Sequence, residues 1–497
     1  MANLLCYKVD KNSCAMEELK EKAENWSDDI TQADIDKLTE AAETGDLDAA
    51  YIVSLFYLKG NEDIPYNDDL ALEWMTFAAE RGFPPSMFCL YKIFNGDYRL
   101  EITKTDTEKA LEWLQKSADA GFVFALRELG FCYYNGVLVD QNYNEALQYF
   151  ASAMEKPDLP SCTMVARMLE EGQGIEKNLE GAIELYKLAA EAGDAEAQDS
   201  LGYHYFHGKI VEKDWKQAYE WWMKAAAQNF PNSLHNIAIM YENGEYVERD
   251  LEKAIKWHTK AVEFGSGESL YGLGCAFKDL HDDEQAFEWL LKSAEFGDMN
   301  AQAYVGYCYE KGKGIKKDDE KALEWTSKAI EGGSVAAMYN LGEMYRYGHC
   351  VKRNYKKAYE LERRAAESGL ADAQHALGLR YLRGEKKDCV KQDPREAFHW
   401  FMKAADQGHA FAMCDIGAMY QLGEYVAQDF STAFEWFIKA AAGGDALAMY
   451  NVGRMYLTGK GVKKDKAEAI TWLQRASEGG CVQAEELLGT IKFSPME

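Results

Sequence analysis

The chain has 497 residues, 47% of them apolar, and 83 acidic against 55 basic residues give it a formal net charge of −28. A surface this acidic repels phosphate backbones and anionic lipid headgroups, so nucleic-acid and membrane-surface partners are disfavoured. Trp, Lys and Asp interrupt every apolar helical run, so we expect no membrane insertion. The start of the chain lacks the pattern of a signal peptide, and we expect a cytoplasmic protein.

The first 45 residues differ from the rest of the chain. Met16 to Asn25 has the pattern of a charged helix, and Thr31 to Glu43 has that of the second helix of an incomplete repeat. The open ends of a repeat array need polar covers. We therefore assign residues 1–45 to an N-terminal segment with capping helices.

From residue 46 onwards, one pattern of paired helices recurs twelve times. Its plainest copy, Asn300 to Gly333, has apolar residues at helical spacing, a turn at Gly312 and a second helical run that opens at Asp318. Positions equivalent to Gly333 recur at spacings of 32 to 39 residues, most often 36. These landmark positions are Gly45, Gly82, Gly121, Pro157, Gly193, Asn229, Gly265, Gly297, Gly333, Gly369, Gly408, Gly444 and Gly480. A period in this range predicts an all-α solenoid.

Two further positions of the repeat, and the landmark itself, keep the same residue types from repeat to repeat, and we call each such set a column. Fifteen residues before each landmark after Gly45 stands an Asp or Asn, which can cap the second helix by accepting hydrogen bonds from its first amides. These residues are Asn67, Asp106, Asn142, Asn178, Asp214, Asp250, Asp282, Asp318, Asn354, Asp393, Asp429 and Asp465. Eleven before each landmark stands Ala, which predicts a close approach of helix backbones. The landmark Gly or Asn itself suits the left-handed conformation that ends a helix.

Eight residues before the landmark, nine of the twelve repeats have Trp. One large ring at the same helical position in each repeat favours a wedge between stacked repeats over an aromatic ligand box. The nine are Trp74, Trp113, Trp221, Trp257, Trp289, Trp325, Trp400, Trp436 and Trp472.

The chain closes with a lone first helix, Val482 to Ile491, and a short tail from Phe493 to Glu497. This helix can cover the apolar face of the twelfth repeat. We therefore divide the chain into residues 1–45, twelve repeats over residues 46–480, and a C-terminal capping helix with its tail over residues 481–497.

The motif Leu-Gly-x-x-Tyr-x-x-Gly, followed by Ala-x-x-Trp-x-x-Lys-Ala-Ala-x-x-Gly, resembles the Sel-one-like repeat family of tetratricopeptide-like solenoids. Leu201 to Gly208 with Ala218 to Asn229 carries it, as does Val452 to Gly459 with Ala469 to Gly480. The resemblance covers roughly residues 46 to 490. It implies a right-handed superhelix of antiparallel helix pairs and a scaffold or adaptor role. It names no partner, because the family is functionally diverse.

The sequence carries no recognisable catalytic, cofactor or metal-binding pattern. Gly312-Lys-Gly314 lacks the spacing of a phosphate-binding loop. His204 and His207 share a helix, but no Cys or acidic residue stands at a matching ligand spacing. The eleven cysteines drift within the repeat, so we expect free thiols. We therefore expect no enzyme, no cofactor and no metal site.

The surface left for function is the concave face, which the first helices line in solenoids of this type. Its non-core positions carry aromatic and basic residues, the types that dominate recognition surfaces. The candidates are Tyr51, Phe88, Lys92, Arg127, Phe131, Tyr134, Arg167, Tyr203, Phe206, Tyr271, Tyr307, Tyr339 and Tyr450. Alternatively, several of these rings pack between adjacent first helices. We expect a protein or peptide segment in the groove, with an acidic end near Arg127 and Arg167.

Two functions fit such a surface. The leading one is a non-catalytic interaction scaffold or adaptor. The alternative is a specific inhibitor or immunity-type protein that wraps and neutralises one enzyme. Co-purification of one stoichiometric partner would favour the alternative, and several substoichiometric partners would favour the scaffold.

Overall fold

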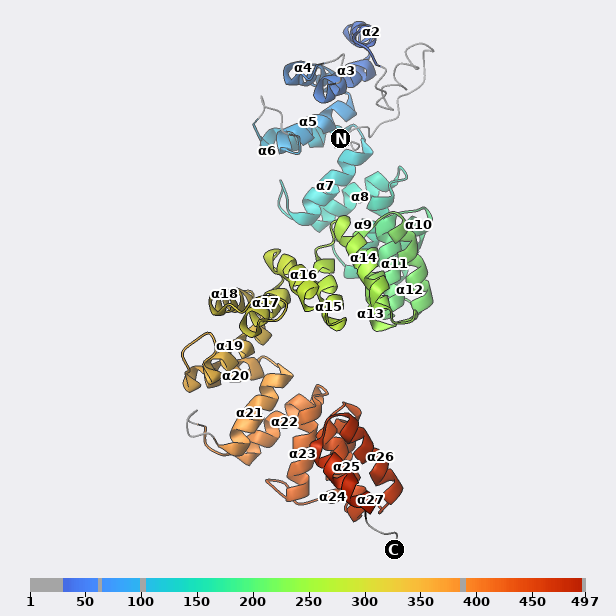
Figure 1. Cartoon of the computed structure of the whole chain (residues 1–497). Coiled ribbons are helices and arrows are strands. Elements are labelled where there is room, and N and C mark those ends of the chain that lie inside the picture. Colours follow the sequence, from blue (N-terminus) through green and yellow to red (C-terminus); the bar gives the residue numbers. More distant parts are fainter. Residues whose placement is uncertain (1–29, 61–64, 99–103, 385–389, 494–497) are drawn as a thin grey trace. The chain divides into compact units, whose positions relative to one another are not determined.

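The computed structural model describes residues 30–60, 65–98, 104–384 and 390–493 (Figure 1). These residues form 26 α-helices and contain no β-strand. The helices belong to two compact units, one ending at Arg249 and one beginning at Asp250. The predicted helix Met16–Asn25 and most of the C-terminal tail lie outside the described residues.

In the first unit, each helix from α2 to α13 packs against the next along the chain. Its first helices are α3 (Leu47–Lys59), α5 (Pro84–Asn95), α7 (Val123–Asn135), α9 (Leu159–Glu171), α11 (Ala195–His207) and α13 (Pro231–Asn243). Its second helices are α2 (Gln32–Glu43), α4 (Asp68–Glu80), α6 (Thr107–Asp119), α8 (Tyr143–Met154), α10 (Leu179–Glu191) and α12 (Trp215–Ala227).

The second unit continues the same alternation, and each helix from α14 to α27 again packs against the next. Its second helices are α14 (Leu251–Glu263), α16 (Asp283–Glu295), α18 (Asp319–Glu331), α20 (Tyr355–Glu367), α22 (Pro394–Asp406), α24 (Phe430–Ala442) and α26 (Lys466–Glu478). Its first helices are α15 (Glu268–Asp279), α17 (Met299–Lys311), α19 (Val335–Tyr347), α21 (Ala371–Arg383), α23 (Ala410–Leu422), α25 (Ala446–Thr458) and α27 (Val482–Phe493). The predicted all-α solenoid of helix pairs is confirmed, and the handedness of its superhelix stays a prediction.

The predicted helix boundaries follow from local chemistry. In all twelve repeats, the Asp or Asn caps its second helix and accepts a hydrogen bond from a first-turn amide. The landmark glycines have φ between 75° and 109°, and Asn229 has 60°. Only residues that tolerate this left-handed region fit there. At the landmark of the third repeat, Pro157 cannot adopt it, and α8 ends early, at Met154.

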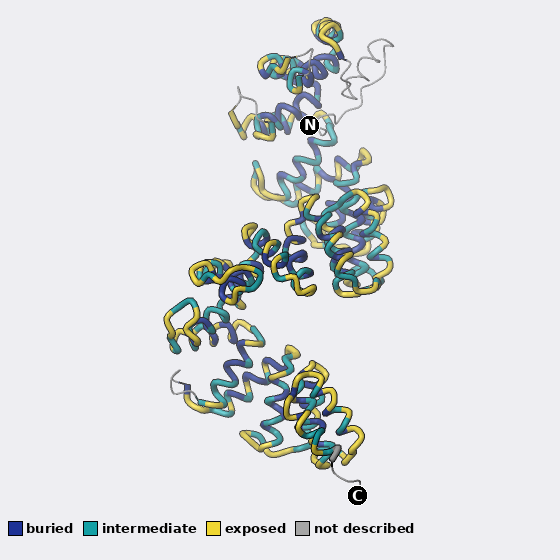
Figure 2. Tube along the Cα trace, in the orientation of Figure 1, coloured by how far each residue is buried: buried dark blue, intermediate teal, exposed yellow. Residues whose placement is uncertain are grey.

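Within each unit the core lies between packed helices, and Figure 2 shows the buried residues along them in dark blue. The predicted Ala column is buried throughout, with at most 1% exposure. A second column, seven residues before each landmark, is equally buried, with at most 2% exposure. It consists of Met75, Leu114, Phe150, Tyr186, Trp222, His258, Leu290, Thr326, Glu362, Phe401, Phe437 and Leu473. In eight of the twelve repeats this column packs against a glycine of the first helix, and a Cβ at Gly378, for example, would lie 2.6 Å from the Phe401 ring.

The Trp column packs between repeats, as predicted; Trp400 is buried, and the other eight rings stay partly accessible. Trp221 packs against the preceding core around Tyr186, and Trp472 against the core around Phe437. In eight of the nine Trp repeats, a Lys or Arg three residues later lies over the indole, 3.5 to 5.9 Å from the ring centre. This cation covers the ring face that the neighbouring repeat leaves open.

Candidate functional site

First helices of neighbouring repeats contact one another as well as their own second helices. Helix α11 contacts both α9 and α13 in the first unit, and α17 contacts α19 in the second. Side chains from successive repeats can therefore form one surface within a unit. The predicted binding residues all lie on first helices.

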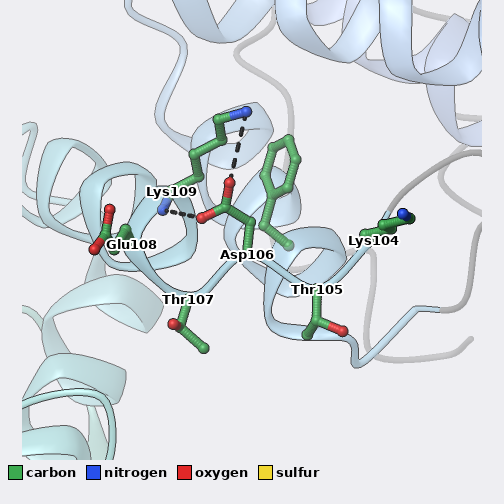
Figure 3. Close-up of a pocket in the computed structure, with 7 residues that line it drawn as sticks. Lys104, Thr105, Asp106, Thr107, Glu108 and Lys109 are labelled. Atoms are coloured by element: carbon green, nitrogen blue, oxygen red, sulfur yellow. Dashed lines mark hydrogen bonds and ion pairs between the residues drawn. The ribbon is translucent and has the colours of Figure 1, made fainter.

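One hollow lies away from this surface, where the second helix α6 begins (Figure 3). It has a volume of about 550 Å³ and surrounds the helix cap. The Asp106 carboxylate accepts a hydrogen bond from the Lys109 amide at 3.1 Å and pairs with the Lys109 ammonium at 3.6 Å. Because these groups already serve the cap, we assign the hollow to helix structure.

The predicted aromatic residues differ in how accessible they are. Tyr51 and Phe88 are only 4% and 8% exposed, so they follow the alternative in which rings pack between helices. Tyr203 is exposed, at 38%. The other seven rings are half-buried: Phe131, Tyr134, Phe206, Tyr271, Tyr307, Tyr339 and Tyr450. Half-buried rings are held by the core and still offer an edge or a face to a partner.

The three predicted basic residues are paired within the chain. Lys92 lies 3.0 Å from Asp97 and 3.7 Å from Glu128. Arg127 Nη1 lies 2.7 Å from Asp158 Oδ1, where α9 begins. Sequence reasoning missed these partners, and an acidic ligand would have to compete with them.

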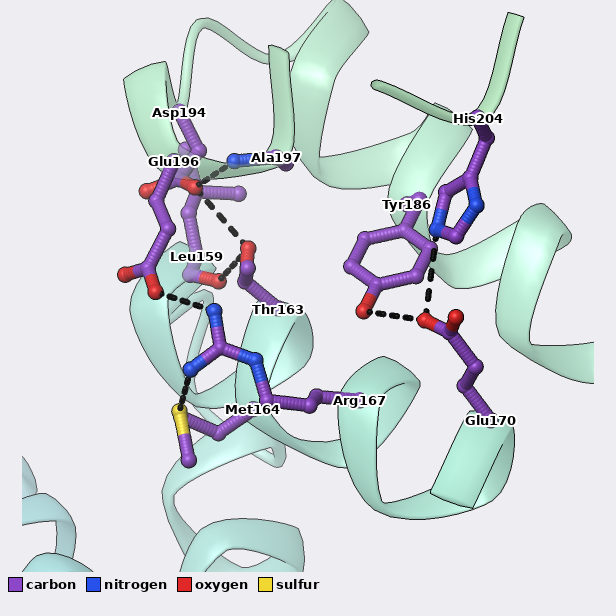
Figure 4. Close-up of polar contacts among 10 residues, drawn as sticks. All are labelled: Leu159, Thr163, Met164, Arg167, Glu170, Tyr186, Asp194, Glu196, Ala197 and His204. Carbon is purple, nitrogen blue, oxygen red and sulfur yellow. Dashed lines mark hydrogen bonds and ion pairs between the residues drawn. The ribbon is translucent and has the colours of Figure 1, made fainter. Parts of the chain in front are cut away.

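Arg167 is also paired, through a contact between neighbouring first helices. Its Nη2 atom lies 2.6 Å from Glu196 Oε1, and its Nη1 atom faces the Met164 sulfur (Figure 4). The Asp194 carboxylate beside it accepts hydrogen bonds from the Thr163 hydroxyl and the Ala197 amide. These contacts fix α9 against α11.

A polar triad crosses the core of the first unit on the other side of the same helices (Figure 4). Tyr186 donates to Glu170 Oε2 at 3.1 Å, and His204 Nε2 lies 3.2 Å from the same oxygen. Burial acts to raise the pKa of Glu170, but the hydrogen bonds and charge of these two partners lower it overall. Glu170 therefore stays ionised beside two buried rings.

The second unit has a charged triad at the same three repeat positions. Arg346, Glu362 and Arg380 stand where Glu170, Tyr186 and His204 stand in the first unit. Glu362 is fully buried and accepts two hydrogen bonds of 2.7 Å from Arg346, with Arg380 Nε at 3.3 Å. In this repeat, the buried column seven residues before the landmark thus holds a carboxylate with two guanidinium partners.

Two hollows lie on the first helices next to the charged triad. The larger has a volume of about 440 Å³ and lies among α19, α21 and the start of α23, with Tyr339 and Phe411 in its wall. The smaller has about 330 Å³ and includes Tyr307 and Glu310 of α17. Both share Glu343 and Tyr347 of α19, so they adjoin each other.

The described residues include no cluster of three groups that could hold a metal ion. Among the helices that the structure describes, none is long and apolar enough to cross a membrane. The cysteines in the described ranges are free thiols: Cys89, Cys132, Cys162, Cys275, Cys308, Cys350, Cys414 and Cys481. Cys6, Cys14 and Cys389 lie outside those ranges.

The Sel1-repeat family model matches twelve consecutive segments of this chain. They are residues 47–83, 93–122, 123–158, 159–194, 195–230, 231–266, 267–298, 300–334, 335–370, 371–409, 410–445 and 446–481.

Two solved structures are similar to the chain. The c5321 protein, a protective antigen present in uropathogenic Escherichia coli strains, is 28% identical with a TM-score of 0.55, covering 93% of this chain and 91% of that one. A Sel1 repeat protein from Oxalobacter formigenes is 33% identical with a TM-score of 0.44, covering 48% and 99%.

A curated relative is similar over a shorter stretch. The chitin synthase regulator SKT5 of Saccharomyces cerevisiae is 28% identical over 121 residues, 24% of this chain. The chain thus spans only 17% of the length of that relative.

Proposed function

Because this chain belongs to the Sel1-repeat family, we propose that it is a non-catalytic scaffold or adaptor that binds a protein partner across its first helices. Solenoids of Sel1 repeats are typical of protein–protein interaction scaffolds. The net charge of −28 supports a protein partner over nucleic acid. The free thiols fit a reducing compartment, and we assign the protein to the cytoplasm.

The observation that carries the proposal is a set of large apolar side chains exposed on first helices. Tyr203, Tyr347, Phe411 and Leu447 are 38%, 51%, 61% and 49% exposed. A partner that covers these side chains would remove their apolar area from water. The half-buried tyrosines around them supply rigid contact area.

The proposal keeps the groove candidates of the first unit, with an acidic partner end near Arg127 and Arg167. Such an end would displace Asp158 and Glu196 from these arginines. The proposal also keeps the domain boundaries predicted from the sequence, in which α2 and α27 cover the two ends of the repeat array formed by residues 46–480.

The test is partner capture from the native host with two matched variants of the full chain. One variant carries Tyr203→Ser and Leu447→Ser on first helices. The control carries Leu188→Ser on α10 and Phe296→Ser just after α16, which are 60% and 82% exposed. We expect the first variant to lose the partners that wild type and control retain, as measured by quantitative mass spectrometry.

Identical partner sets for both variants would contradict the first-helix surface. The stoichiometry of the captured proteins separates the two functional classes. Several substoichiometric partners support a scaffold, and one stoichiometric enzyme supports an inhibitor.

A further inference from the structure

The strongest candidate for a specific contact point is the pair of adjoining hollows in the second unit. The larger hollow has an apolar wall built from Tyr339 and Leu379, with Phe411 at 61% exposure. The smaller hollow combines the Tyr307 and Tyr347 rings with charged side chains and Asn340. A single extended segment can occupy both, because the hollows meet at shared residues.

The shared carboxylate of Glu343 is only loosely paired. Its Oε1 atom lies 3.8 Å from Arg346 Nε and 3.8 Å from Arg380 Nη2. Both guanidinium groups make their shorter contacts, 2.7 and 3.3 Å, with the buried Glu362. Burial raises the pKa of Glu343 and the negative charge of Glu362 raises it further, while the charges of Arg380 and Arg346 oppose this rise without cancelling it. A cation placed against Glu343 would therefore be favoured by charge that the chain leaves poorly compensated.

The charged side chains of the smaller hollow also favour a cationic ligand. It carries two carboxylates, Glu310 and Glu343, against the Lys311 ammonium and the His349 imidazole, which lies 3.1 Å from Glu310. That ammonium is already bound to Glu310 at 2.6 Å. The Tyr347 ring, 51% exposed, lines the same hollow as Glu343; His349 stacks on it at 5.8 Å, and a cation can lie against its other face.

In the larger hollow, Leu379 and Phe411 form an apolar part among charged side chains and the imidazoles of His375 and His409. Its arginines, Arg380 and Arg383, and its acidic residues, Glu343 and Asp372, balance in number. Burial raises the pKa of the Tyr339 phenol, and the negative charges of Glu343, Glu362 and Asp372 add to the rise. The field at this wall is therefore negative, which also opposes an acidic ligand.

We propose that the two hollows bind one segment of a basic protein partner, with an apolar side chain against Phe411 and the next Lys or Arg against Glu343 and Tyr347. This inference rests on the proposed function. It adds one binding site in the second unit and the chemistry of the partner segment that binds there. The acidic chain as a whole would attract such a partner and speed its association.

The test uses a random peptide library displayed on phage and selected on the full-length chain. Enriched peptides are synthesised, and their affinities are measured by fluorescence anisotropy against wild type and four variants. Glu343→Gln and Phe411→Ser remove the two proposed contacts. Glu435→Gln on α24 and Leu422→Ser at the end of α23 are the matched controls on exposed residues of the same unit. Thermal unfolding confirms that each variant is folded.

We expect enriched peptides that combine a large apolar residue with a nearby Lys or Arg. Glu343→Gln and Phe411→Ser should each weaken binding by about tenfold, and the controls by less than about twofold. Added salt should reduce the effect of Glu343→Gln, because that contact is between charges.

Three results would overturn the inference. They are acidic peptides whose binding Phe411→Ser weakens, a set of enriched peptides none of which is weakened by Glu343→Gln or Phe411→Ser, and a library without any enriched binder. Partner capture with the Tyr203 and Leu447 variant decides the proposed function independently of all three.

Discussion

A Cβ atom added to Gly202 of α11 would lie 2.4 Å from Cδ1 and Nε1 of Trp222 on α12. The ring therefore packs directly on the backbone of the first helix, and its Nε1 atom donates to the Asp199 carbonyl oxygen at 3.2 Å. In the same way, a Cβ atom added to Gly130 would lie 2.6 Å from the Phe150 ring. Each such pair fixes the distance between the two helices of its repeat.

Gly202→Ala should destabilise the protein, because the added methyl group must displace the indole. Overpacking of this kind costs about 1–3 kcal/mol. Gly489→Ala on α27 is the control, since a Cβ there meets nothing within 4 Å. That substitution should gain about 0.5–1 kcal/mol from the better helix former. Urea unfolding followed by circular dichroism measures both, and equal shifts of the same sign would contradict the packing account.

Glu362→Leu should be one of the most damaging single substitutions in the second unit. It leaves Arg346, with a side chain 5% exposed, and Arg380, at 12%, without their common carboxylate. Removing one partner of a buried ion pair typically costs about 3–5 kcal/mol. The measurement is the free energy of unfolding in urea.

Replacing the whole charged triad should recover most of that loss. Repeat twelve has Leu457 and Leu473 where Arg346 and Glu362 stand, so an apolar version of this core exists in the same chain. We expect the variant with Arg346→Leu, Glu362→Leu and Arg380→Met to be more stable than Glu362→Leu alone. A triple variant less stable than the single one would show that the charges do more than fill the core.

Deprotonation of Asp199 should make the first unit less stable as the pH rises from about 4 to about 6. Burial raises the pKa of Asp199 to about 6, against the opposing hydrogen bonds from Ser233 and Asn236. In this window the folded chain holds a proton that the unfolded chain releases, so stability falls with increasing pH. Each pKa unit corresponds to about 1.4 kcal/mol.

The variant Asp199→Asn removes this titration and keeps a hydrogen-bonding side chain. Its stability relative to wild type should increase between pH 4 and pH 7, whereas Asp140→Asn at an exposed position should show no such trend. The readout is the urea midpoint at several pH values. A flat difference for Asp199→Asn would refute the assignment.

Asp318→Ala should cost about 1 kcal/mol, a typical value for the loss of an N-cap. The Asp318 carboxylate accepts hydrogen bonds from the Glu320 and Lys321 amides at 3.1 and 3.0 Å. Asp318→Ser keeps an acceptor and should retain most of the stability. Thermal unfolding of the two variants provides the comparison, and indistinguishable midpoints would argue against the cap.

The features that could be predicted from the sequence are those with a fixed residue type at a fixed position. The Asp and Asn caps, the buried Ala column and the landmark glycines all meet this condition. The core column that includes Trp222 and Glu362 escaped notice because its residue type changes from repeat to repeat. Its position is constant, and the facing glycine at Gly202 was the available signal.

The candidate site was harder to predict, because its contacts join residues one repeat apart. The pairing of Arg127 with Asp158 depends on how neighbouring first helices align, which the pattern within one repeat does not specify. For the same reason, the sequence could not show that Tyr51 and Phe88 are buried whereas Tyr271, at the equivalent repeat position, is half-buried. Glu343 and Tyr347 join two hollows only once α17, α19 and α21 are placed side by side.

Site-specific photo-crosslinking in the native host tests the central claim most directly. A benzophenone amino acid is placed at Tyr203 and Tyr450 on first helices, and at Leu188 and Glu435 on second helices. The account predicts protein adducts from the first pair that are absent from the second pair. Adducts formed only from the second-helix positions would show that partners bind elsewhere on the solenoid.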